Sequence, residues 1–169
     1  MDIRSKKRIV IMGDSGRGKS TLADKISESL GVKLYSADDL IWEEKFSKQR
    51  TKEESLNMSL DIASLDNWVF EGSSLRLNKC FLEIADLVIY LEHKNFISQS
   101  IILYKRFLTR DNETFFNFMT LLKHNLYCRY RLGYKNGSIS DLAFLDSNNI
   151  EHIRLSSFKE IDDFVSTNT

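Results

Sequence analysis

The chain has 169 residues, with 24 basic and 24 acidic side chains and therefore a formal net charge of zero. This length predicts one domain, over residues 1–169, with a core of its own. The balanced charge argues against a surface built for nucleic acid or for an anionic membrane. No apolar run approaches the ~20 residues of a membrane span, and we expect no secretory leader. Cys80 and Cys128 show no metal-binding spacing, which indicates reduced thiols in the cytoplasm.

A strand, a glycine-rich loop and a helix are predicted at the start of the chain. Residues 8–12, RIVIM, are a short apolar run typical of a buried parallel strand. Residues 13–20, GDSGRGKS, match the phosphate-binding pattern G-x-x-x-x-G-K-[ST] at every fixed position. A helix over about 19–30 follows, because apolar residues recur there at every fourth position. The dinucleotide-binding pattern G-x-G-x-x-G fits less well, because Thr21 stands where its third glycine belongs.

Each residue type in this loop has a chemical reason. Glycines let the backbone wrap a phosphate with its N–H groups, and the helix N-terminus adds about half a positive charge. Lys19 brings a full charge to the β- and γ-phosphates, and the Ser20 hydroxyl is a natural ligand of Mg²⁺. We therefore predict a nucleoside triphosphate with Mg²⁺, and the absence of a guanine-reading N/TKxD motif after the later strands favours ATP over GTP. The residues expected to contact the nucleotide are Gly13, Asp14, Ser15, Gly16, Arg17, Gly18, Lys19, Ser20 and Thr21.

Strands and helices are predicted to alternate along the rest of the chain. Further strands are expected over 33–36, 68–70, 87–91 and 150–155. Capping boxes at Thr51–Glu54 and Ser157–Glu160 predict two helix starts. Short helices are expected around Leu77 and Phe81 and near 141–146. A helix that begins at Asn95 has one apolar face, made of Ile97, Ile101, Tyr104 and Leu108. A long helix over about 114–132 has an apolar face made of Phe115, Met119, Leu122, Leu126 and Tyr130.

This alternation predicts an α/β fold with a parallel sheet covered by helices on both faces. Ligands bind beyond the carboxyl ends of the strands in such sheets. The polar residues that directly follow strands are Asp38, Asp39, Glu71, Glu92 and the pair Ser156–Ser157. These residues are therefore the first candidates for a site.

A second acid is needed to hold Mg²⁺, and both Glu71 and Glu92 follow apolar strands. We favour Glu71, because Gly72 after it allows a close approach of backbone or ligand, and we interpret Glu92 as a surface acid. Of Asp38 and Asp39, one is expected to cap the next helix. The other would orient an acceptor hydroxyl or accept its proton, and we assign that role to Asp38.

Arginines supply three further predictions. Arg76 follows Glu71 on the same rim and could grip an anionic substrate. Arg106 and Arg110 share one helix face beside a polar break, from where they could neutralise charge on a transferring phosphoryl group. Residues 114–140 contain basic and tyrosine side chains and no acid, which could form a nucleic-acid surface. We favour ordinary packing for that segment, so nucleic acid is an unlikely partner.

Four stretches, GDSGRGKST, SADDLIW, WVFEGSSLR and ADLVIYLE, resemble the adenylate-kinase-like topology modulation proteins of the nucleoside and nucleotide kinase superfamily. The resemblance implies a three-layer P-loop NTPase fold with five strands in the order 2-3-1-4-5, and ATP with Mg²⁺. It implies a helical acceptor-site segment over about 39–66 and a short lid over about 106–114. Glu71 departs from the family's commoner aspartate.

The sequence therefore predicts a cytoplasmic kinase, monomeric or homodimeric, that transfers the γ-phosphate of Mg·ATP to a small-molecule acceptor. In this prediction Lys19, Arg106, Arg110 and Asp38 are catalytic, Asp38 and Arg76 bind the acceptor, and Ser20 and Glu71 hold the metal. The alternative is a nucleotide-dependent regulator, or a switch associated with nucleic acid, with weak ATPase activity.

Overall fold

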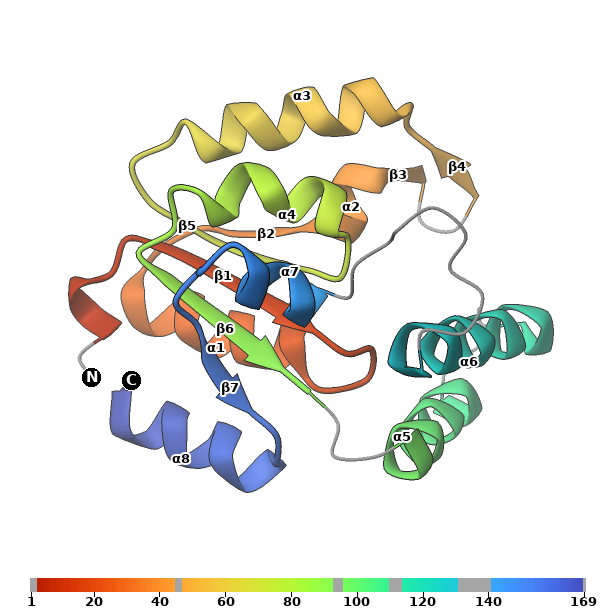
Figure 1. Cartoon of the computed structure of the whole chain (residues 1–169). Helices are drawn as coiled ribbons and strands as arrows, with labels where there is room; N and C mark the ends of the chain where they lie inside the picture. Colours follow the sequence, from red (N-terminus) through yellow and green to blue (C-terminus); the bar gives the residue numbers. More distant parts are fainter. Residues whose placement is uncertain (1–2, 45–46, 93–95, 110–113, 131–140, 169) are drawn as a thin grey trace.

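A parallel sheet of five strands forms the centre of the computed structural model, which describes residues 3–44, 47–92, 96–109, 114–130 and 141–168 (Figure 1). The strands are β1 (Arg8–Gly13), β2 (Leu34–Ser36), β5 (Trp68–Gly72), β6 (Leu87–Leu91) and β7 (Ile153–Leu155). They lie in the order β2-β5-β1-β6-β7, which is 2-3-1-4-5 when these strands alone are counted along the chain. The α/β class predicted from the sequence is confirmed.

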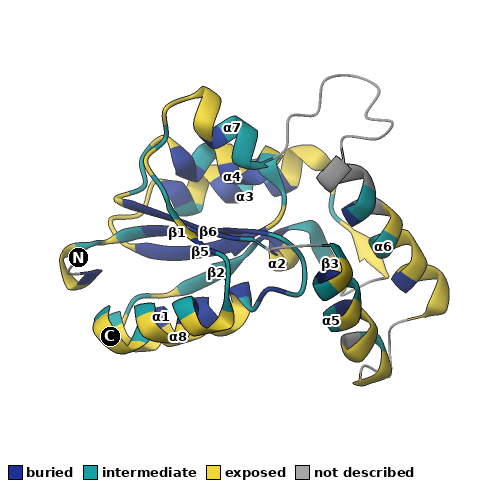
Figure 2. Cartoon of the chain, turned by 60° about the horizontal axis from the view of Figure 1, so that its bottom comes forward, coloured by how far each residue is buried: buried dark blue, intermediate teal, exposed yellow. Residues whose placement is uncertain are grey.

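Helices cover both faces of the sheet (Figures 1 and 2). On one face lie α1 (Lys19–Leu30) and α8 (Phe158–Asn168), and on the other lie α2 (Ala37–Ile41), α3 (Lys52–Ala63), α4 (Leu75–Leu82) and α7 (Asp141–Ser147). The remaining pair, α5 (Phe96–Thr109) and α6 (Phe115–Tyr130), pack on each other beyond the carboxyl ends of the strands (Figure 1). None of the described helices is long and apolar enough to cross a bilayer.

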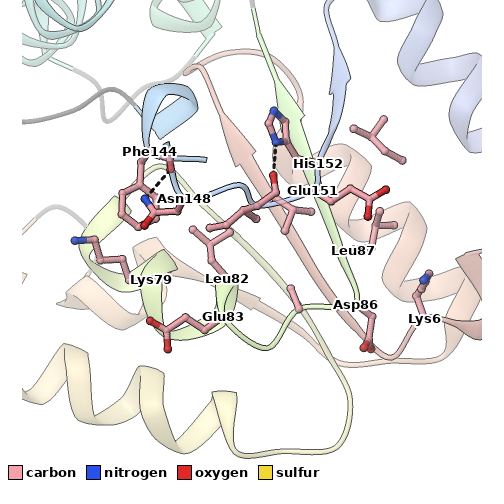
Figure 3. Close-up of a pocket in the computed structure, with 14 residues that line it drawn as sticks. Lys6, Lys79, Leu82, Glu83, Asp86, Leu87, Phe144, Asn148, Glu151 and His152 are labelled. Carbon is pink, nitrogen blue, oxygen red and sulfur yellow. Dashed lines mark hydrogen bonds between the residues drawn. The ribbon is translucent and has the colours of Figure 1, made fainter. Parts of the chain in front are cut away.

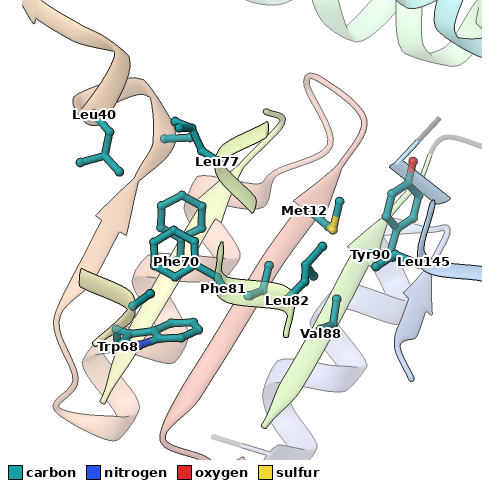
Figure 4. Packing of buried hydrophobic residues seen from close by; sticks show 13 residues of the cluster. Met12, Leu40, Trp68, Phe70, Leu77, Phe81, Leu82, Val88, Tyr90 and Leu145 are labelled. Carbon is teal, nitrogen blue, oxygen red and sulfur yellow. The ribbon is translucent and has the colours of Figure 1, made fainter. Parts of the chain in front are cut away.

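Two apolar clusters hold these layers together, one on each face of the sheet. Alternate residues of β1 point to opposite faces, so Val10 and Met12 join one cluster while Ile9 and Ile11 join the other. On the α4 face, the ring of Phe81 stacks on Phe70, with 3.8 Å between the ring centroids (Figure 4). Every residue of β5 and β6 is buried, as expected for the inner strands of a covered parallel sheet.

The capping signals mark true helix starts. Thr51 and Glu54 form the complete reciprocal box at the start of α3. At the start of α8, the Ser157 hydroxyl accepts the N–H of Glu160 at 3.1 Å. The prediction that Asp38 or Asp39 caps the second helix is wrong. Ser36 is the N-cap of α2, and its hydroxyl accepts the N–H of Asp38 at 3.3 Å.

The segment predicted as helical over 39–66 contains a short antiparallel ribbon, β3 (Trp42–Glu44) and β4 (Lys48–Gln49), between α2 and α3. Arg50 stabilises the junction, because its Nη1 donates to the backbone carbonyls of Asp39 and Trp42 at 2.6 and 2.5 Å. These carbonyls lie at the C-terminal end of α2, where helix carbonyls lack partners within the helix. The ribbon thus lies between the end of α2 and the start of α3.

The apolar face predicted for α5 is wrong, and the one predicted for α6 is wrong in part, because Leu122 and Leu126 are half-buried. Half or more of each of Ile97, Ile101, Tyr104 and Leu108 is exposed, and Phe115 and Met119 of α6 are exposed too. The two helices also pack through residues outside these faces: Gln99 Nε2 donates to Asn125 Oδ1 at 2.9 Å, and both side chains are buried. Because the two amides bond to each other, they are buried at little cost beside the apolar Leu103 and Phe118.

Candidate phosphate-binding site

The predicted phosphate-binding loop connects the end of β1 to the start of α1. Gly13 is required at the start of the loop, because its φ is +127° and an added Cβ would lie 2.0 Å from the backbone oxygen of Leu91 in β6. The next residue, Asp14, donates its N–H to that same oxygen at 2.8 Å. The loop is therefore anchored to β6 at its first residue, beyond the carboxyl ends of the strands.

Lys19 lies folded into this loop. Its Nζ donates to the backbone oxygens of Gly13 at 3.0 Å and Asp14 at 2.9 Å, and its side chain is buried. Burial lowers the pKa of the Lys19 ammonium, and the negative charges nearby oppose that shift. The acids that act on it, from the strongest, are Glu71, Asp14, Asp141 and Asp38. The Lys19 ammonium is thus held at the loop by two backbone oxygens.

Ser20 and Glu71, the two predicted metal ligands, lie together. Ser36 stands opposite Glu71 in the register of β2 and β5, and Ser20 begins the first turn of α1. The Oε1 atom of Glu71 accepts hydrogen bonds from Ser36 Oγ at 2.7 Å and from Ser20 Oγ at 3.3 Å. A buried carboxylate with hydroxyl neighbours suits Mg²⁺, a hard cation that prefers oxygen.

Nowhere in the described part of the chain do three or more His, Cys, Asp or Glu side chains cluster as a metal site.

Glu92, at the end of β6, has different neighbours from Glu71. Its backbone N–H donates to Leu155 of β7 at 3.1 Å, and its charge acts on Arg17, whereas Glu71 is the strongest acid on Lys19. Spacing in the sequence does not distinguish Glu71 from Glu92 as the candidate metal ligand, but the two acids have different neighbours in the structure. The arrangement supports Glu71 as the acid beside Lys19 and Ser20.

Arg17 packs inward between the loop and α8. The side chain is buried, and its guanidinium carbon lies 4.5 Å from the ring centroid of Phe158. Among the described residues, its Nε and Nη2 have no hydrogen-bond partner. Burial lowers the pKa of the guanidinium, opposed by the charges of Glu160, Asp14 and Glu92. The side chain of Arg17 thus joins the loop to the start of α8.

The predicted acceptor residues Asp38 and Arg76 belong to α2 and α4, which cover the face of the sheet opposite α1 and α8. Asp38 is exposed in α2, and its charge is among those that act on Lys19. Arg76 is exposed in α4 and donates through Nη1 to the backbone oxygen of Lys52 at 2.8 Å, which joins α4 to the start of α3. Gly72 permits the approach of α2, since an added Cβ would lie 2.4 Å from Ala37 Cβ.

The predicted lid falls mostly outside the described residues. Arg110 lies outside them, and so does the side chain of Arg106, which belongs to α5. The same holds for the side chain of Arg129. What the structure shows is that α5 contacts the phosphate loop, because an added Cβ on Gly16 would lie 3.2 Å from both Ile102 Cγ2 and Leu103 Cδ2.

Two residues of the site escape the sequence analysis. Ser36 could have been found, because a serine before a short acidic helix is a common N-cap. Asp141 carries no local signal, because only the packing of α7 against β1 brings it near Lys19. Burial and the charge of Asp14 raise the pKa of Asp141 to about 6, although Lys19 opposes the shift.

A separate cavity of about 570 Å³ lies at the amino-terminal ends of β6 and β7, between α4 and α7 (Figure 3). Lys79 lies on one wall, with its Nζ 4.9 Å from the ring centroid of Phe144. Near the other wall, His152 Nδ1 is 2.7 Å from the backbone oxygen of Ile150. The cavity includes none of the residues predicted to bind phosphate or metal, so we separate it from the candidate site.

Comparison with known proteins gives a partial relative and several structures of the same fold. No family model matches the chain. A Bacillus subtilis (strain 168) protein, the uncharacterized protein YqaC, is 31% identical over 87 residues, which are 51% of this chain and 49% of that protein. The chain thus matches about half the length of this curated relative.

Three solved structures resemble nearly the whole chain. A shikimate kinase from Bacteroides thetaiotaomicron is 18% identical over 96% of each chain, with a TM-score of 0.57. A shikimate kinase from Acinetobacter baumannii, in complex with shikimate, is 14% identical over 98% of this chain and 92% of that one, with a TM-score of 0.59. A gluconokinase from Sinorhizobium meliloti 1021 is 19% identical over 95% of this chain and 87% of that one, with a TM-score of 0.55. At these identities the likeness shows the fold, so the chain has the P-loop fold on which these kinases are built.

Proposed function

We propose that this chain is a kinase that binds Mg·ATP on the 13–20 loop and transfers the γ-phosphate to a small-molecule acceptor. The convergence of Lys19, Ser20 and Glu71 at one edge of the sheet carries this proposal, because it brings a phosphate-binding cation beside two oxygen ligands for a metal. The fold adds support, since proteins named shikimate kinase and gluconokinase share it and one of them was solved with shikimate bound.

In the proposed complex, the loop N–H groups and Lys19 bind the β- and γ-phosphates. Lys19 would exchange its hydrogen bonds to the loop oxygens for bonds to phosphate, so its buried charge would gain a better partner. Ser20 and Glu71 would hold the Mg²⁺, which when bound neutralises charge on the phosphate oxygens. Transfer then depends mainly on positioning and on charge neutralisation.

The acceptor would lie on the α2–α4 side of Lys19. Asp38 would orient its hydroxyl, and Arg76 would bind an anionic group on it. Arg106 and Arg110, whose spacing predicts one shared helix face, would close over the γ-phosphate. The hydrogen bond of Arg76 to Lys52 uses one of its five N–H groups, which leaves donors for a ligand.

The test is a transfer assay with γ-labelled ATP and a panel of small hydroxyl and phosphate acceptors, preceded by a thermal-shift screen of nucleotides. Mg·ATP should raise the melting temperature, because binding to the native state stabilises it by mass action. At least one acceptor should become labelled by the wild type and not by Lys19→Ala. If ATP is hydrolysed and no acceptor is ever labelled, the kinase proposal is wrong and the alternative of a nucleotide-dependent switch takes its place.

A further inference from the structure

Helix α5 carries apolar residues on two sides, and only one of these sides is buried. On the buried side, Gln99 bonds to α6, and Leu103 lies beside Gly16 of the phosphate loop. The other side is half or more exposed and consists of Ile97, Ile101, Tyr104 and Leu108, which we call the α5 stripe. Figure 1 shows α5 and α6 set apart from the helices that cover the sheet. A helix that is apolar all round is normally buried all round, so the α5 stripe calls for a partner.

The spacing of the α5 stripe matches a second copy of the same helix. Its residues are separated by four, three and four positions, the alternation of the a and d positions of a coiled coil. This order of spacings is the same in both directions along the chain. An antiparallel copy of α5 therefore meets the stripe in register, with Ile97 facing Leu108 and Ile101 facing Tyr104. Such a contact has twofold symmetry, the commonest symmetry of protein dimers.

Helix α6 extends the exposed apolar surface. The ring centroid of Phe118 lies 6.1 Å from that of Tyr104 and 6.3 Å from that of Phe115, so the two helices share one patch. Phe115 and Met119, one turn apart in α6, are 65% and 44% exposed, and the α5 stripe ranges from 51% for Ile101 to 72% for Ile97.

The area of this patch is that of a dimer interface. A fully exposed large side chain presents about 200 Å², so the stripe with Phe115 and Met119 leaves roughly 700 Å² open on each chain. The largest apolar patch on a typical monomer is about 300–600 Å². A stable interface buries about 800 Å² per partner. The patch is therefore larger than a monomer usually exposes and close to what a stable dimer needs.

The charges beside the α5 stripe are compatible with this pairing. The flanking positions in the heptad are Ser98, Ser100, Lys105 and Phe107, so each copy brings one charge to the edge of the contact. Antiparallel pairing places Lys105 beside Ser98 of the second copy, not beside the second Lys105. With helix axes about 8–10 Å apart, this offset keeps the two ammonium groups roughly a Debye length from each other.

We propose that the protein is a homodimer in which the α5 stripe packs antiparallel on the α5 stripe of a second copy, with Phe115 and Met119 at the edges of the contact. This inference does not depend on the kinase function. It bears on the phosphate site, because Ile102 and Leu103 of α5 border Gly16 of the loop. The dimer contact would hold that helix beside the loop in both copies.

The experiment measures the mass of the full chain by sedimentation equilibrium over a range of concentrations. At about 10 µM the wild type should have twice the 19.7 kDa mass of one chain, since interfaces of standard size bind at micromolar concentration or below. Ile101→Glu and Tyr104→Lys should each weaken the dimer about 100-fold or more, because each variant buries unpaired charges. Leu60→Glu changes a leucine of α3 that is as exposed as Ile101, and it should remain dimeric. Circular dichroism checks that all variants fold.

Mixing the two stripe variants tests the direction of the pairing. Ile101 faces Tyr104 of the second copy only when the helices are antiparallel, so an equimolar mixture of Ile101→Glu and Tyr104→Lys should recover dimers through one glutamate–lysine pair. A mixture that stays monomeric would overturn the antiparallel pairing.

Other results would overturn the dimer itself. If the wild type is monomeric throughout, or if both stripe variants remain dimeric, the α5 stripe is not a dimer contact. A monomeric wild type that sediments with phosphatidylserine vesicles, and loses this binding in Ile101→Glu, would make the stripe a membrane-docking surface instead.

Discussion

Ser36 Oγ donates a 2.7 Å hydrogen bond to Glu71 Oε1, across two neighbouring parallel strands. The same hydroxyl accepts the N–H of Asp38 as the N-cap of α2. One side chain thus starts the helix that carries Asp38 and orients the acid assigned to the metal. The acceptor side and the metal side of the proposed site are joined through this serine.

Glu71→Gln should lower Mg²⁺-dependent turnover far more than nucleotide affinity. A neutral amide supports a hydrated cation poorly, although it keeps the shape of the side chain and can still bond to Ser36 and Ser20. Titration of turnover against Mg²⁺ concentration measures the effect. Glu92→Gln is the control, because Glu92 lies near Arg17. If only Glu92→Gln raises the Mg²⁺ requirement, the two acids have been assigned in reverse.

Ser36→Ala should cost about 1 kcal/mol of stability through the lost N-cap, and it should also weaken Mg²⁺-dependent turnover, because Glu71 loses its shortest hydrogen bond. Urea unfolding and steady-state kinetics measure the two effects. Ser36→Thr keeps both the acceptor and the donor, so it should restore both properties. A loss of stability without any change in turnover would limit Ser36 to its capping role.

Lys19→Ala should leave the fold intact and weaken Mg·ATP binding. The loss of a charged hydrogen bond to phosphate is worth about 2–3 kcal/mol, or roughly 30- to 150-fold in Kd. Calorimetric titration with Mg·ATP measures the affinity, and circular dichroism checks the fold. Lys25→Ala removes an exposed lysine of the same helix and should bind ATP as the wild type does. Equal affinity of the two variants would exclude the loop as the nucleotide site.

Asp141→Asn should stabilise the protein at pH 7.5 and have little effect at pH 4. The pKa of Asp141 is about 6 in the folded chain, above its ordinary value of 3.8, so the folded chain binds more protons between these pH values. The stability linked to this group is therefore present below about pH 4 and lost as the pH rises past 6. The expected gain at pH 7.5 is on the order of 2 kcal/mol.

Urea unfolding of both proteins at the two pH values measures this difference. Asp24→Asn, which removes an exposed acid, should show no such pH dependence. A destabilised Asp141→Asn at pH 7.5 would mean that the charged carboxylate is favourable in the folded chain. That result would contradict the cost of burial that raises the pKa of Asp141.

Arg106→Ala and Arg110→Ala should each lower transfer and leave ATP affinity close to that of the wild type. An arginine that neutralises charge in the transition state is worth ~10³-fold or more in rate, whereas a solvated arginine changes neither property. Single-turnover transfer and equilibrium binding, measured side by side, separate these cases. Wild-type transfer by both variants would remove the predicted lid.

The local sequence determined the strand, loop and helix that form the phosphate-binding part of the candidate site. Glycines at fixed spacing, an apolar strand before them and a helix after them specify the loop through backbone freedom and periodicity, which act over a few residues. The same holds for the capping box of Thr51 and Glu54, which the structure reproduces in full. The α/β class followed from the alternation of strands and helices, and the structure confirms it.

Tertiary structure decided which residues meet. Ser36 bonds to Glu71, 35 residues away, because β2 and β5 pair in one register, and no local pattern encodes that register. Asp141 lies near Lys19 only because α7 packs on β1. In α5, the stripe of Ile97 and Ile101 follows the helical period as a buried face would, yet the stripe with Gln99 is buried. The period of the apolar residues predicts that a helix has an apolar face, but the element against which the helix packs decides which face is buried.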